Sequence, residues 1–455
     1  MSALTAVILA AGKGVRMKSD IPKVLHCVAG KPMLAHVLDA AEVAGCARKI
    51  VITGFGADKV ASVVKEQAEI AEQKEQLGTG HAVIQAKPLL KDFNGTVMIL
   101  CGDTPLLDGS DLRRFYEQHT ETGNQATVLT AVLPDATGYG RIVRATDGRI
   151  EKIVEQKDAL TEELDIKEIN TGIYCFDSTE LFAALEKVDC NNAQGEYYLT
   201  DVIAKLVEKD AKVGAVIAAD AASVMGVNSR RDLAVAEKWL RWKTNNHMMD
   251  EGVTIIDPEN TYIDANVVIG RDTIIQPYTW LEGNTVIGKN CVIGPNTRLT
   301  NMQIGDGSSL HFTYAHDAAV GKNTNIGPFV HIRPDSCLAD GVKVGNFVEI
   351  KNSSVGKGSK LPHLSYIGDA DVGENVNIGC GCIIVNYDGK KKSRTNIGDN
   401  AFVGCNSNLV APVVLGDNCY IAAGSTITKE VPGNCLGVAR ARQRNIDCWQ
   451  GPGGR

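Results

Sequence analysis

The feature that most constrains this chain is a six-residue repeat of aliphatic residues in its second half. Three runs place Ile, Leu or Val at every sixth position: Ile269, Ile275, Leu281, Ile287, Ile293 and Leu299; Val320, Ile326, Ile332, Leu338, Val344 and Ile350; Ile397, Val403, Leu409, Leu415, Ile421 and Ile427. An α-helix would need a period of 3.6 residues, and a simple strand or an ordinary β-sandwich a period of two. A period of six, with Gly and Asn in the turns, predicts a left-handed parallel β-helix of hexapeptide repeats.

The repeat also makes two local predictions. Ile384 and Ile397 are thirteen residues apart, one more than two repeats, so a loop around Lys390–Lys392 is expected to leave the β-helix. Such loops are common binding elements. Arg333 and Lys351 are eighteen residues apart, which is one full coil of a three-sided helix. We expect these two cations to stack on one face as an anion clamp.

The first half of the chain has a different pattern. Apolar, β-rich runs at Leu4–Ala11, Lys49–Thr53, Thr96–Cys101 and Ala126–Leu133 are separated by helix-like segments such as Pro32–Ala44. This alternation predicts an α/β domain, with a mainly parallel, Rossmann-like sheet covered by helices.

A linking helix is predicted between the two halves. Ser229 and Asp232 have the spacing of a capping box, and the residues up to Asp250 suit a helix. The expected domains are therefore 1–229, a helical linker 230–250, and 251–455.

Composition narrows the classes of partner. The net charge is −7, from 47 basic and 54 acidic residues, which argues against a nucleic-acid or membrane-surface binder. No stretch approaches the ~20 apolar residues of a membrane helix, and the N-terminus lacks the features of a signal peptide. The 13 cysteines include no C-x-x-C pair, so we expect reduced thiols and a cytoplasmic protein.

The loop after the first predicted strand has the residues of a phosphate site. Gly12 and Gly14 directly follow Leu4–Ala11, and Lys13, Arg16 and Lys23 add positive charge. Glycines at this place let backbone N–H groups approach a phosphate closely. The spacing matches neither a P-loop nor a dinucleotide fingerprint.

A candidate metal ligand follows a second strand. Asp103 comes just after Thr96–Cys101, and ligands of open α/β sheets bind beyond the carboxyl ends of strands. An aspartate there is well placed to hold Mg²⁺ against a triphosphate, although a strand-end Asp can equally serve as a turn residue.

Several motifs carry a family resemblance: LAAGKGVRM, PKVL, QLGTGHA, CGDTPLL, TGYGRI, VEQKD, INTG and GVNSR. They resemble those of the sugar-nucleotide pyrophosphorylases. Together with the hexapeptide β-helix, the whole chain resembles the bifunctional N-acetylglucosamine-1-phosphate uridyltransferase/glucosamine-1-phosphate acetyltransferase family. The resemblance implies that acetyl-CoA acetylates glucosamine-1-phosphate, and that UTP then converts the product to UDP-N-acetylglucosamine for cell-wall precursors. It also implies Mg²⁺ as cofactor and a homotrimer.

The same resemblance assigns roles in the first half. Asp103 and Asn228 would ligate Mg²⁺, and Val15 departs from the Thr that is usual in the family. The residues that would bind UTP and UDP-N-acetylglucosamine are Leu9, Ala10, Ala11 and Gly12 around the nucleotide, Arg16 and Lys23 on its phosphates, Gln73, Gln76, Gly78 and Thr79 at the uracil and nucleoside, and Gly140, Glu155, Asn170 and Asn228.

In the second half, the resemblance makes His363 the general base that takes a proton from the glucosamine amine. An imidazole suits this role because its unperturbed pKa is near neutral. The amino-sugar phosphate would contact Arg333, Lys351, Tyr366 and Asn377, and acetyl-CoA would contact Cys380, Asn386, Tyr387, Cys405, Ala423 and Arg440. Cys380 and Cys405 stand where other members often have Ala and Ser.

Two other functions remain open on the sequence. The chain could be a sugar-1-phosphate nucleotidyltransferase whose β-helix is only structural or regulatory, or a non-enzymatic interaction protein. His363, Asn386 and the interrupted repeat argue against the first, and Lys23 and Asp103 against the second. His311, His316 and His331 could suggest a metal site, but their offsets do not match the coil period.

Overall fold

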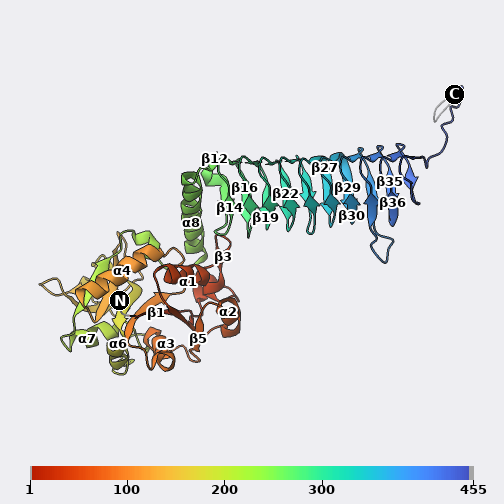
Figure 1. Ribbon diagram of the computed structural model, residues 1–455. Helices are drawn as coiled ribbons and strands as arrows, with labels where there is room; N and C mark the ends of the chain where they lie inside the picture. The colour runs from red at the N-terminus through yellow and green to blue at the C-terminus, as the bar shows by residue number, and fades with distance from the viewer. Residues whose placement is uncertain (1–2, 450–455) are drawn as a thin grey trace. The chain divides into compact units, whose positions relative to one another are not determined.

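A computed structural model describes residues 3–449 (Figure 1). The chain divides into two compact units, Met1–Leu240 and Arg241–Arg455, and the division falls within helix α8 (Arg230–Asp250). Asp232 N–H donates to Ser229 Oγ at 3.2 Å, and Ser229 N–H donates to Asp232 Oδ2 at 2.8 Å. These are the two bonds of a capping box, so this predicted motif is confirmed.

The first unit is built on a twisted sheet with helices on both faces. The strand order is β11-β7-β10-β6-β1-β4-β5, with β8 pairing β10 and β9. Strands β5, β4, β1 and β6 run parallel to one another, and so do β7 and β11, whereas β10 is antiparallel. The strands are β1 (Ala3–Leu9), β2 (Cys27–Val28), β3 (Lys31–Pro32), β4 (Arg48–Thr53), β5 (Glu69–Glu72), β6 (Gly95–Cys101), β7 (Ala126–Val132), β8 (Arg141–Arg144), β9 (Ile150–Val154), β10 (Glu168–Asp177) and β11 (Val213–Ile217).

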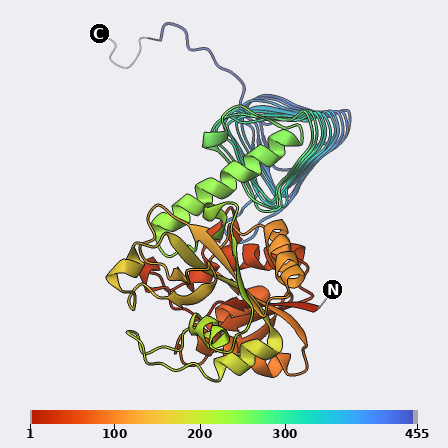
Figure 2. The same cartoon turned by 90° about the vertical axis from the view of Figure 1, so that its left-hand side faces the viewer.

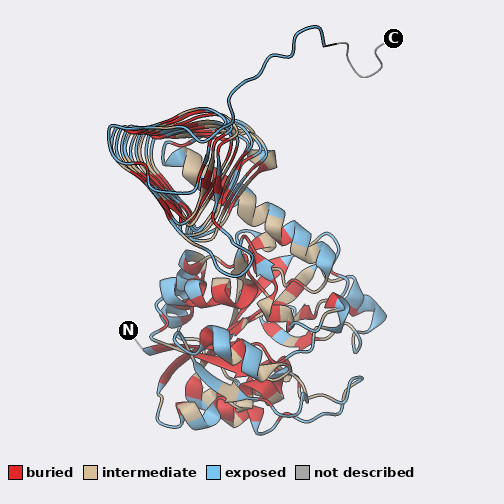
Figure 3. Cartoon of the chain, turned by 90° about the vertical axis from the view of Figure 1, so that its right-hand side faces the viewer, coloured by how far each residue is buried: buried red, intermediate tan, exposed pale blue. Residues whose placement is uncertain are grey.

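The sheet of this unit separates the core into two layers, and helices cover each of them (Figure 3). The helices are α1 (Met33–Val43), α2 (Ala57–Val64), α3 (Thr79–Ile84), α4 (Gly109–Thr122), α5 (Thr161–Leu164), α6 (Ser178–Leu185) and α7 (Asp201–Val207). The predicted strands and the helix at 32–44 are confirmed, with ends that shift by one or two residues.

The second unit is a parallel β-helix with three faces, which Figure 2 shows end-on as a triangular stack of coils. The first face contains β12 (Thr254–Ile255), β15 (Ile274–Ile275), β18 (Val292–Ile293), β21 (Ser309–Leu310), β24 (Asn325–Ile326), β31 (Asn377–Ile378), β34 (Phe402–Val403), β37 (Tyr420–Ile421) and β39 (Leu436–Gly437).

The second face follows the first along each coil, and the third closes the triangle. The second contains β13 (Thr261–Ile263), β16 (Thr279–Glu282), β19 (Arg298–Thr300), β22 (Thr313–His316), β25 (Val330–Ile332), β32 (Ile383–Val385), β35 (Asn408–Val410) and β38 (Thr426–Ile427). The third contains β14 (Val268–Ile269), β17 (Val286–Ile287), β20 (Gln303–Ile304), β23 (Ala319–Val320), β26 (Cys337–Leu338), β28 (Ser354–Val355), β30 (Ala370–Val372), β33 (Thr395–Ile397) and β36 (Val413–Leu415).

Two long strands turn the corner between the first and second faces, which we call the first corner. They are β27 (Lys343–Lys351) and β29 (Lys360–Gly368), and each pairs with strands of both faces. The aliphatic residues of all three predicted six-residue runs are buried inside the coils. The hexapeptide β-helix is therefore confirmed.

The predicted loop is present where the repeat is interrupted. Between β32 and β33 the chain leaves the coil, and a bridge between Tyr387 and Lys392 closes the excursion (Figure 1). Within residues 3–449, no helix combines the length and the apolar character needed to cross a membrane.

Candidate active sites

The phosphate loop and Asp103 meet at the carboxyl edge of the sheet of the first unit. Leu9 and Cys101 are partners in the parallel pair β1–β6, and Gly102 N–H donates to Leu9 O at 2.9 Å. The chain after each strand therefore emerges side by side. Gly14 has φ +62°, and a Cβ there would lie 2.6 Å from the Lys23 Cβ, so the loop requires glycine at this position.

Lys23, Asp103 and Asn228 form the polar centre of this edge. The Lys23 ammonium pairs with the Asp103 carboxylate and lies 3.2 Å from Asn228 Oδ1. Asp232 holds the Asn228 backbone by accepting its N–H at 2.9 Å, and Val227 N–H donates to Asp103 O at 2.8 Å. Two oxygen donors thus converge on one point that already holds a positive charge. Oxygen donors are the ligands that Mg²⁺ prefers, so these residues fit a magnesium ion.

The other residues predicted on the nucleotide line the same loop. Ala10 and Ala11 are buried and hydrogen-bonded through their backbones to Ile52 and Phe55, whereas Gly12 is exposed and has open space where a Cβ would lie. Arg16 borders a hollow of about 390 Å³ that is also lined by Asn228. Val15 is 76% exposed, so its departure from the family leaves the packing of the loop unchanged.

The residues predicted at the uracil base of the nucleotide lie after β5 and at the start of α3. Buried Gln73 donates to Gly78 O at 3.0 Å, and Gln76 Nε2 donates to Gln73 O at 2.9 Å. A Cβ on Gly54 would lie 2.8 Å from Ala11 and 3.0 Å from Gln76, so these two meet there. Thr79 Oγ1 accepts the Leu199 N–H at 3.0 Å, which anchors the start of the helix.

The three residues predicted at the sugar also come together. Asn170 N–H donates to Gly140 O at 2.9 Å, and a Cβ on Gly140 would lie 3.5 Å from both Asn170 Cβ and Glu155 Oε2. Burial raises the pKa of Glu155 above its ordinary value. The hydrogen bond from Thr200 opposes this shift, and the nearby carboxylates of Asp158, Asp201 and Glu196 reinforce it.

This raised pKa makes Glu155→Gln informative. The folded state binds the Glu155 proton more tightly than the unfolded chain does. Protonated Glu155 therefore stabilises the fold below the pKa of the unfolded carboxyl, and this stabilisation is lost as pH rises through the pKa of Glu155 in the folded state. The ionised carboxylate therefore opposes folding at pH 7. We expect Glu155→Gln to raise the unfolding temperature of the first unit more at pH 7 than at pH 4, and to raise the KM for the sugar phosphate about tenfold. Thermal unfolding at both pH values and steady-state kinetics measure this; a variant less stable than the parent at pH 7 would contradict it.

In the second unit, one column of residues runs along the first corner. Asn346 and His363 are partners in the pair β27–β29, and the register of β29 with β31 brings Cys380 next in line. The register of β31 with β34 continues the column to Cys405, and Arg440 Nη1 donates to Ala423 O at 2.9 Å at its far end. Gly424 N–H donates to Cys405 O at 2.8 Å, which joins these last coils. The predicted general base, His363, and four predicted acetyl-CoA residues therefore lie along the first corner of the β-helix.

His363 is exposed, and its imidazole has one polar partner within residues 3–449. Its Nδ1 lies 3.0 Å from Asn346 Oδ1. An amide oxygen only accepts hydrogen bonds, so Nδ1 carries the hydrogen and Nε2 is left with its lone pair. This is the tautomer that a general base needs.

A second cluster surrounds the buried carboxylate of Asp369, which lies between β29 and β30 where the second face ends. Lys351 Nζ lies 3.1 Å from Asp369 Oδ1, Asn352 Nδ2 donates to the same oxygen at 2.6 Å, and Asn386 Nδ2 donates to Oδ2. Asn386 Nδ2 also lies 3.4 Å from the Tyr366 hydroxyl. Burial alone would raise the pKa of Asp369, but the hydrogen bonds from Asn352, Lys351 and Asn386 outweigh it and hold this pKa below its ordinary value.

The predicted stacking of Arg333 on Lys351 is present, because Arg333 N–H donates to Ile350 O at 2.8 Å. Each cation carries an acidic partner, which the spacing did not predict. Arg333 Nη1 lies 3.0 Å from Glu349 Oε1, and Lys351 pairs with Asp369. A phosphate bound by this clamp would therefore share the two cations with carboxylates.

Two predicted residues lie apart from this cluster. Asn377 is on the first face, where it pairs with Lys360 and Phe402. Tyr387 belongs to the loop that leaves the β-helix between β32 and β33, and its hydroxyl donates to Gly389 O at 2.7 Å. A single chain therefore gathers Arg333, Lys351, Tyr366 and Asn386 on one face, and His363 with the column residues at the first corner.

Three residues with roles in these sites were missed from the sequence. Asn346 orients His363, Asp369 orients Asn386 and Lys351, and His81 contacts Gln73. The contacts of Asn346 with His363 and of Asp369 with Asn386 span seventeen residues, so a search at a fixed eighteen misses them, whereas the contact of Asp369 with Lys351 spans eighteen.

The histidines considered for a metal site are only partly together. The His316 and His331 rings lie 6.2 Å apart, because Ala315 pairs with Ile332 and an offset of fifteen makes the two histidines diagonal neighbours. His311 instead contacts Gly294 O. Among residues 3–449, no three His, Cys, Asp or Glu side chains are grouped to hold a metal ion.

Comparisons with known proteins agree with both units. Residues 5–243 match the nucleotidyl transferase family, residues 257–355 match the GMPPB C-terminal domain, and residues 394–429 match the bacterial transferase hexapeptide (six repeats).

Full-length relatives carry the same pair of domains. The chain is 54% identical to bifunctional protein GlmU of Geobacillus sp. (strain WCH70), over 97% of this chain and 96% of that protein. It is 53% identical to the protein of that name from Halalkalibacterium halodurans, over 98% of each chain, and 52% identical to that of Caldanaerobacter subterraneus subsp. tengcongensis, over 99% of this chain and 98% of that one. The chain therefore belongs to the family of bifunctional GlmU proteins and is a bifunctional transferase.

Proposed function

We propose that the two units catalyse successive steps: acetyl transfer from acetyl-CoA to glucosamine-1-phosphate at residues 251–455, then transfer of UMP from UTP to the product at residues 1–229, with 230–250 as the linker. The observation that carries this proposal is the column that joins His363 to the predicted acetyl-CoA residues. A β-helix with a purely structural role would not need an imidazole oriented by Asn346 at the start of such a column. An assay of CoA release from acetyl-CoA and glucosamine-1-phosphate tests it.

In the acetyl transfer, the amine nitrogen of the sugar attacks the thioester carbonyl. The C–N bond forms, the C–S bond breaks, and CoA leaves as thiolate and then takes up a proton. His363 Nε2 accepts the proton that the amine loses, while Asn346 holds the ring through Nδ1. Arg333 and Lys351 would bind the sugar phosphate with Tyr366 and Asn377, and Asn386 would present its amide oxygen because its nitrogen donates to Asp369.

The column suggests how acetyl-CoA lies on the protein. Cys380, Cys405 and Ala423 would line its path along the first corner, with Arg440 on its phosphates and Asn386 and Tyr387 near the thioester. Cys380 is half-buried and Cys405 exposed. Both side chains are small, as those of Ala and Ser are.

In the uridyl transfer, a phosphate oxygen of the sugar-1-phosphate attacks the α-phosphorus of UTP, and the bond to pyrophosphate breaks. Arg16 and Lys23 would stabilise the charge on the phosphate oxygens, and the backbone of Leu9, Ala10, Ala11 and Gly12 would line the nucleotide. Asp103 and Asn228 would hold Mg²⁺, which supplies positive charge against the triphosphate when bound. Gly140, Glu155 and Asn170 would position the sugar, and Gln73, Gln76, Gly78 and Thr79 the nucleoside.

The product, UDP-N-acetylglucosamine, would feed cell-wall precursors, including peptidoglycan and, where present, lipid A. We propose a cytoplasmic location, with no nucleic-acid or membrane partner. The thirteen cysteines, all within residues 3–449 and all free thiols, support a reducing compartment.

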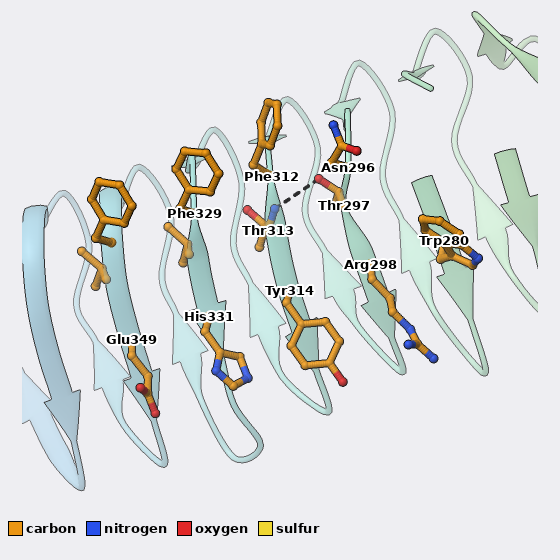
Figure 4. Close-up of a pocket in the computed structure, with 13 residues that line it drawn as sticks. Trp280, Asn296, Thr297, Arg298, Phe312, Thr313, Tyr314, Phe329, His331 and Glu349 are labelled. Carbon is orange, nitrogen blue, oxygen red and sulfur yellow. Dashed lines mark hydrogen bonds between the residues drawn. The ribbon is translucent and has the colours of Figure 1, made fainter. Parts of the chain in front are cut away.

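We also propose that the chain is a homotrimer in which a second copy covers the first corner. Exposed aromatic residues form a ridge there: Phe329 stacks on Phe347 with ring centroids 5.3 Å apart, and Phe312 lies 5.3 Å from Phe329. Phe347 directly follows Asn346, so the ridge borders the His363 column. Beside it lies a hollow of about 570 Å³ on the second face, lined by Trp280, Arg298, Tyr314, His331 and Glu349 (Figure 4). A ridge of this kind on one copy suits a hollow on another.

Phe329→Asp tests this interface, because a carboxylate buried between copies would lack a partner. We expect the variant to sediment as a monomer and to lose acetyl transfer about tenfold or more, with uridyl transfer unchanged. Tyr420→Asp is the matched control, since Tyr420 is also exposed and stacked on another aromatic ring but lies on the first face. A Phe329→Asp chain that keeps the mass of the parent assembly would contradict the proposed interface.

A further inference from the structure

The amide of Gln73 is held by two acceptors. Gln73 follows β5 and is only 3% exposed. Its Nε2 lies 3.0 Å from Gly78 O and 3.1 Å from His81 Nδ1. The two hydrogens of this nitrogen are therefore both used, and within residues 3–449 no hydrogen bond reaches its Oε1.

Gly78 determines which end of the amide faces it. A carbonyl oxygen only accepts, and Gly78 O already accepts the Ala82 N–H at 3.1 Å. Turning the Gln73 amide over would place two oxygens about 3 Å apart with no hydrogen between them. Gly78 is itself fixed, because its φ is +113° and a Cβ there would lie 2.6 Å from Tyr197 O.

His81 supports the same orientation. Since Gln73 Nε2 donates to Nδ1, the neutral ring carries its hydrogen on Nε2. Gln85 Nε2 donates to His81 O at 2.9 Å; it also lies 3.2 Å from the ring Nε2, but a neutral ring accepts at one nitrogen only, so Gln85 does not donate there while Gln73 donates to Nδ1. The other tautomer would make Nδ1 a donor and would turn the Gln73 oxygen toward Gly78 O. The ring lies in α3 with its centroid 6.3 Å from that of Tyr197.

We propose that His81 is a positioning residue that, with Gly78, fixes Gln73 as an acceptor toward the nucleotide base and so selects uracil over cytosine. This rests on the proposed function of Gln73 at the base. Uracil presents an N3–H donor between two carbonyl oxygens, whereas cytosine presents a bare N3 acceptor beside an amino group. A fixed amide oxygen pairs with the first and faces the lone pair of the second. A site built to make a hydrogen bond rejects an analogue that cannot make it.

The test compares UTP and CTP as substrates of the full chain, through kcat/KM for pyrophosphate release with N-acetylglucosamine-1-phosphate. His81→Leu removes one of the two acceptors that hold the amide and leaves Gly78 O alone to oppose its turning over, so the amide can turn and donate an N–H to the lone pair of cytosine N3. We expect the UTP/CTP ratio to fall at least about tenfold, mainly through a higher KM for UTP. His81→Asn places an amide oxygen near the position of Nδ1 and should restore most of the ratio.

Further variants separate the outcomes. Gln85→Leu is the matched control, because it removes the contact at the other ring nitrogen and should leave the ratio unchanged. Gln73→Leu should abolish the preference; if it does not, the proposed base site itself is wrong. If Gln73→Leu abolishes the preference but His81→Leu slows UTP and CTP equally, the base site stands and the role of His81 is overturned. Should His81→Leu fail to fold, His81→Gln and His81→Phe replace it, of which only the first offers an acceptor. A UTP/CTP ratio equal to that of the parent in both variants would overturn the proposal too.

Discussion

His363→Ala should lower the rate of acetyl transfer by about 10²–10⁴-fold, the usual contribution of a positioned general base. The imidazole is exposed at the first corner, and its only polar contact within residues 3–449 is with Asn346. Removing it therefore leaves no unpaired buried group, and the β-helix should unfold at the same temperature. Uridyl transfer should be unchanged, because it belongs to the other unit.

Acetyl transfer and uridyl transfer are compared on the same preparation of each variant. CoA release from acetyl-CoA and pyrophosphate release from UTP are measured on one sample, with His247→Ala as the control for loss of an exposed imidazole on α8. Acetyl transfer within threefold of the parent in His363→Ala would remove His363 from the reaction. A parallel loss of both activities would point to damage of the whole chain rather than to the loss of a base.

Asp103→Asn should lower uridyl transfer at least about 100-fold and leave acetyl transfer unchanged. The substitution keeps the shape of the side chain but removes the charge that pairs with Lys23 and would hold Mg²⁺ beside Asn228. Electrostatic stabilisation of transferring phosphoryl groups is among the largest catalytic terms, and single groups contribute about 10²–10³-fold.

Magnesium titration gives this prediction a second readout. The Asp103→Asn chain should need a higher Mg²⁺ concentration for half-maximal pyrophosphate release than the parent. Asp111→Asn removes an acid in the first turn of α4 that pairs with Arg114 at the surface, and it should behave like the parent. Equal Mg²⁺ dependence in Asp103→Asn and the parent would mean that another group holds the ion.

Periodicity predicted the β-helix because each coil buries one aliphatic side chain per face, and this requirement leaves a direct trace in the sequence. The register between coils leaves a weaker one. Ile293 pairs with Leu310, Leu310 with Ile326 and Ile326 with Val344, so successive coils differ in length. A fixed count of eighteen found the stack of Arg333 on Lys351, but it missed the contact between Asn346 and His363, which spans one residue fewer.

The first unit shows a similar limit. Strand ends predicted the sheet edge where Lys23 and Asp103 meet, because parallel strands carry their following loops to one side. The hydrogen bond from Gln73 to His81 depends on how α3 packs beside the loop before it. No spacing rule encodes such a contact. The acidic partner of Arg333, Glu349, is sixteen residues away and does not follow the spacing of eighteen, whereas Asp369 follows Lys351 by eighteen residues but was not considered.

The most direct test of the account is one reaction with glucosamine-1-phosphate, acetyl-CoA, UTP and Mg²⁺, in which free CoA and pyrophosphate are followed separately. We expect CoA to appear first and pyrophosphate to follow after a lag, and we expect added N-acetylglucosamine-1-phosphate to abolish the lag. Pyrophosphate released only when N-acetylglucosamine-1-phosphate is supplied, with no CoA formed, would contradict the acetyltransferase and leave the β-helix a scaffold.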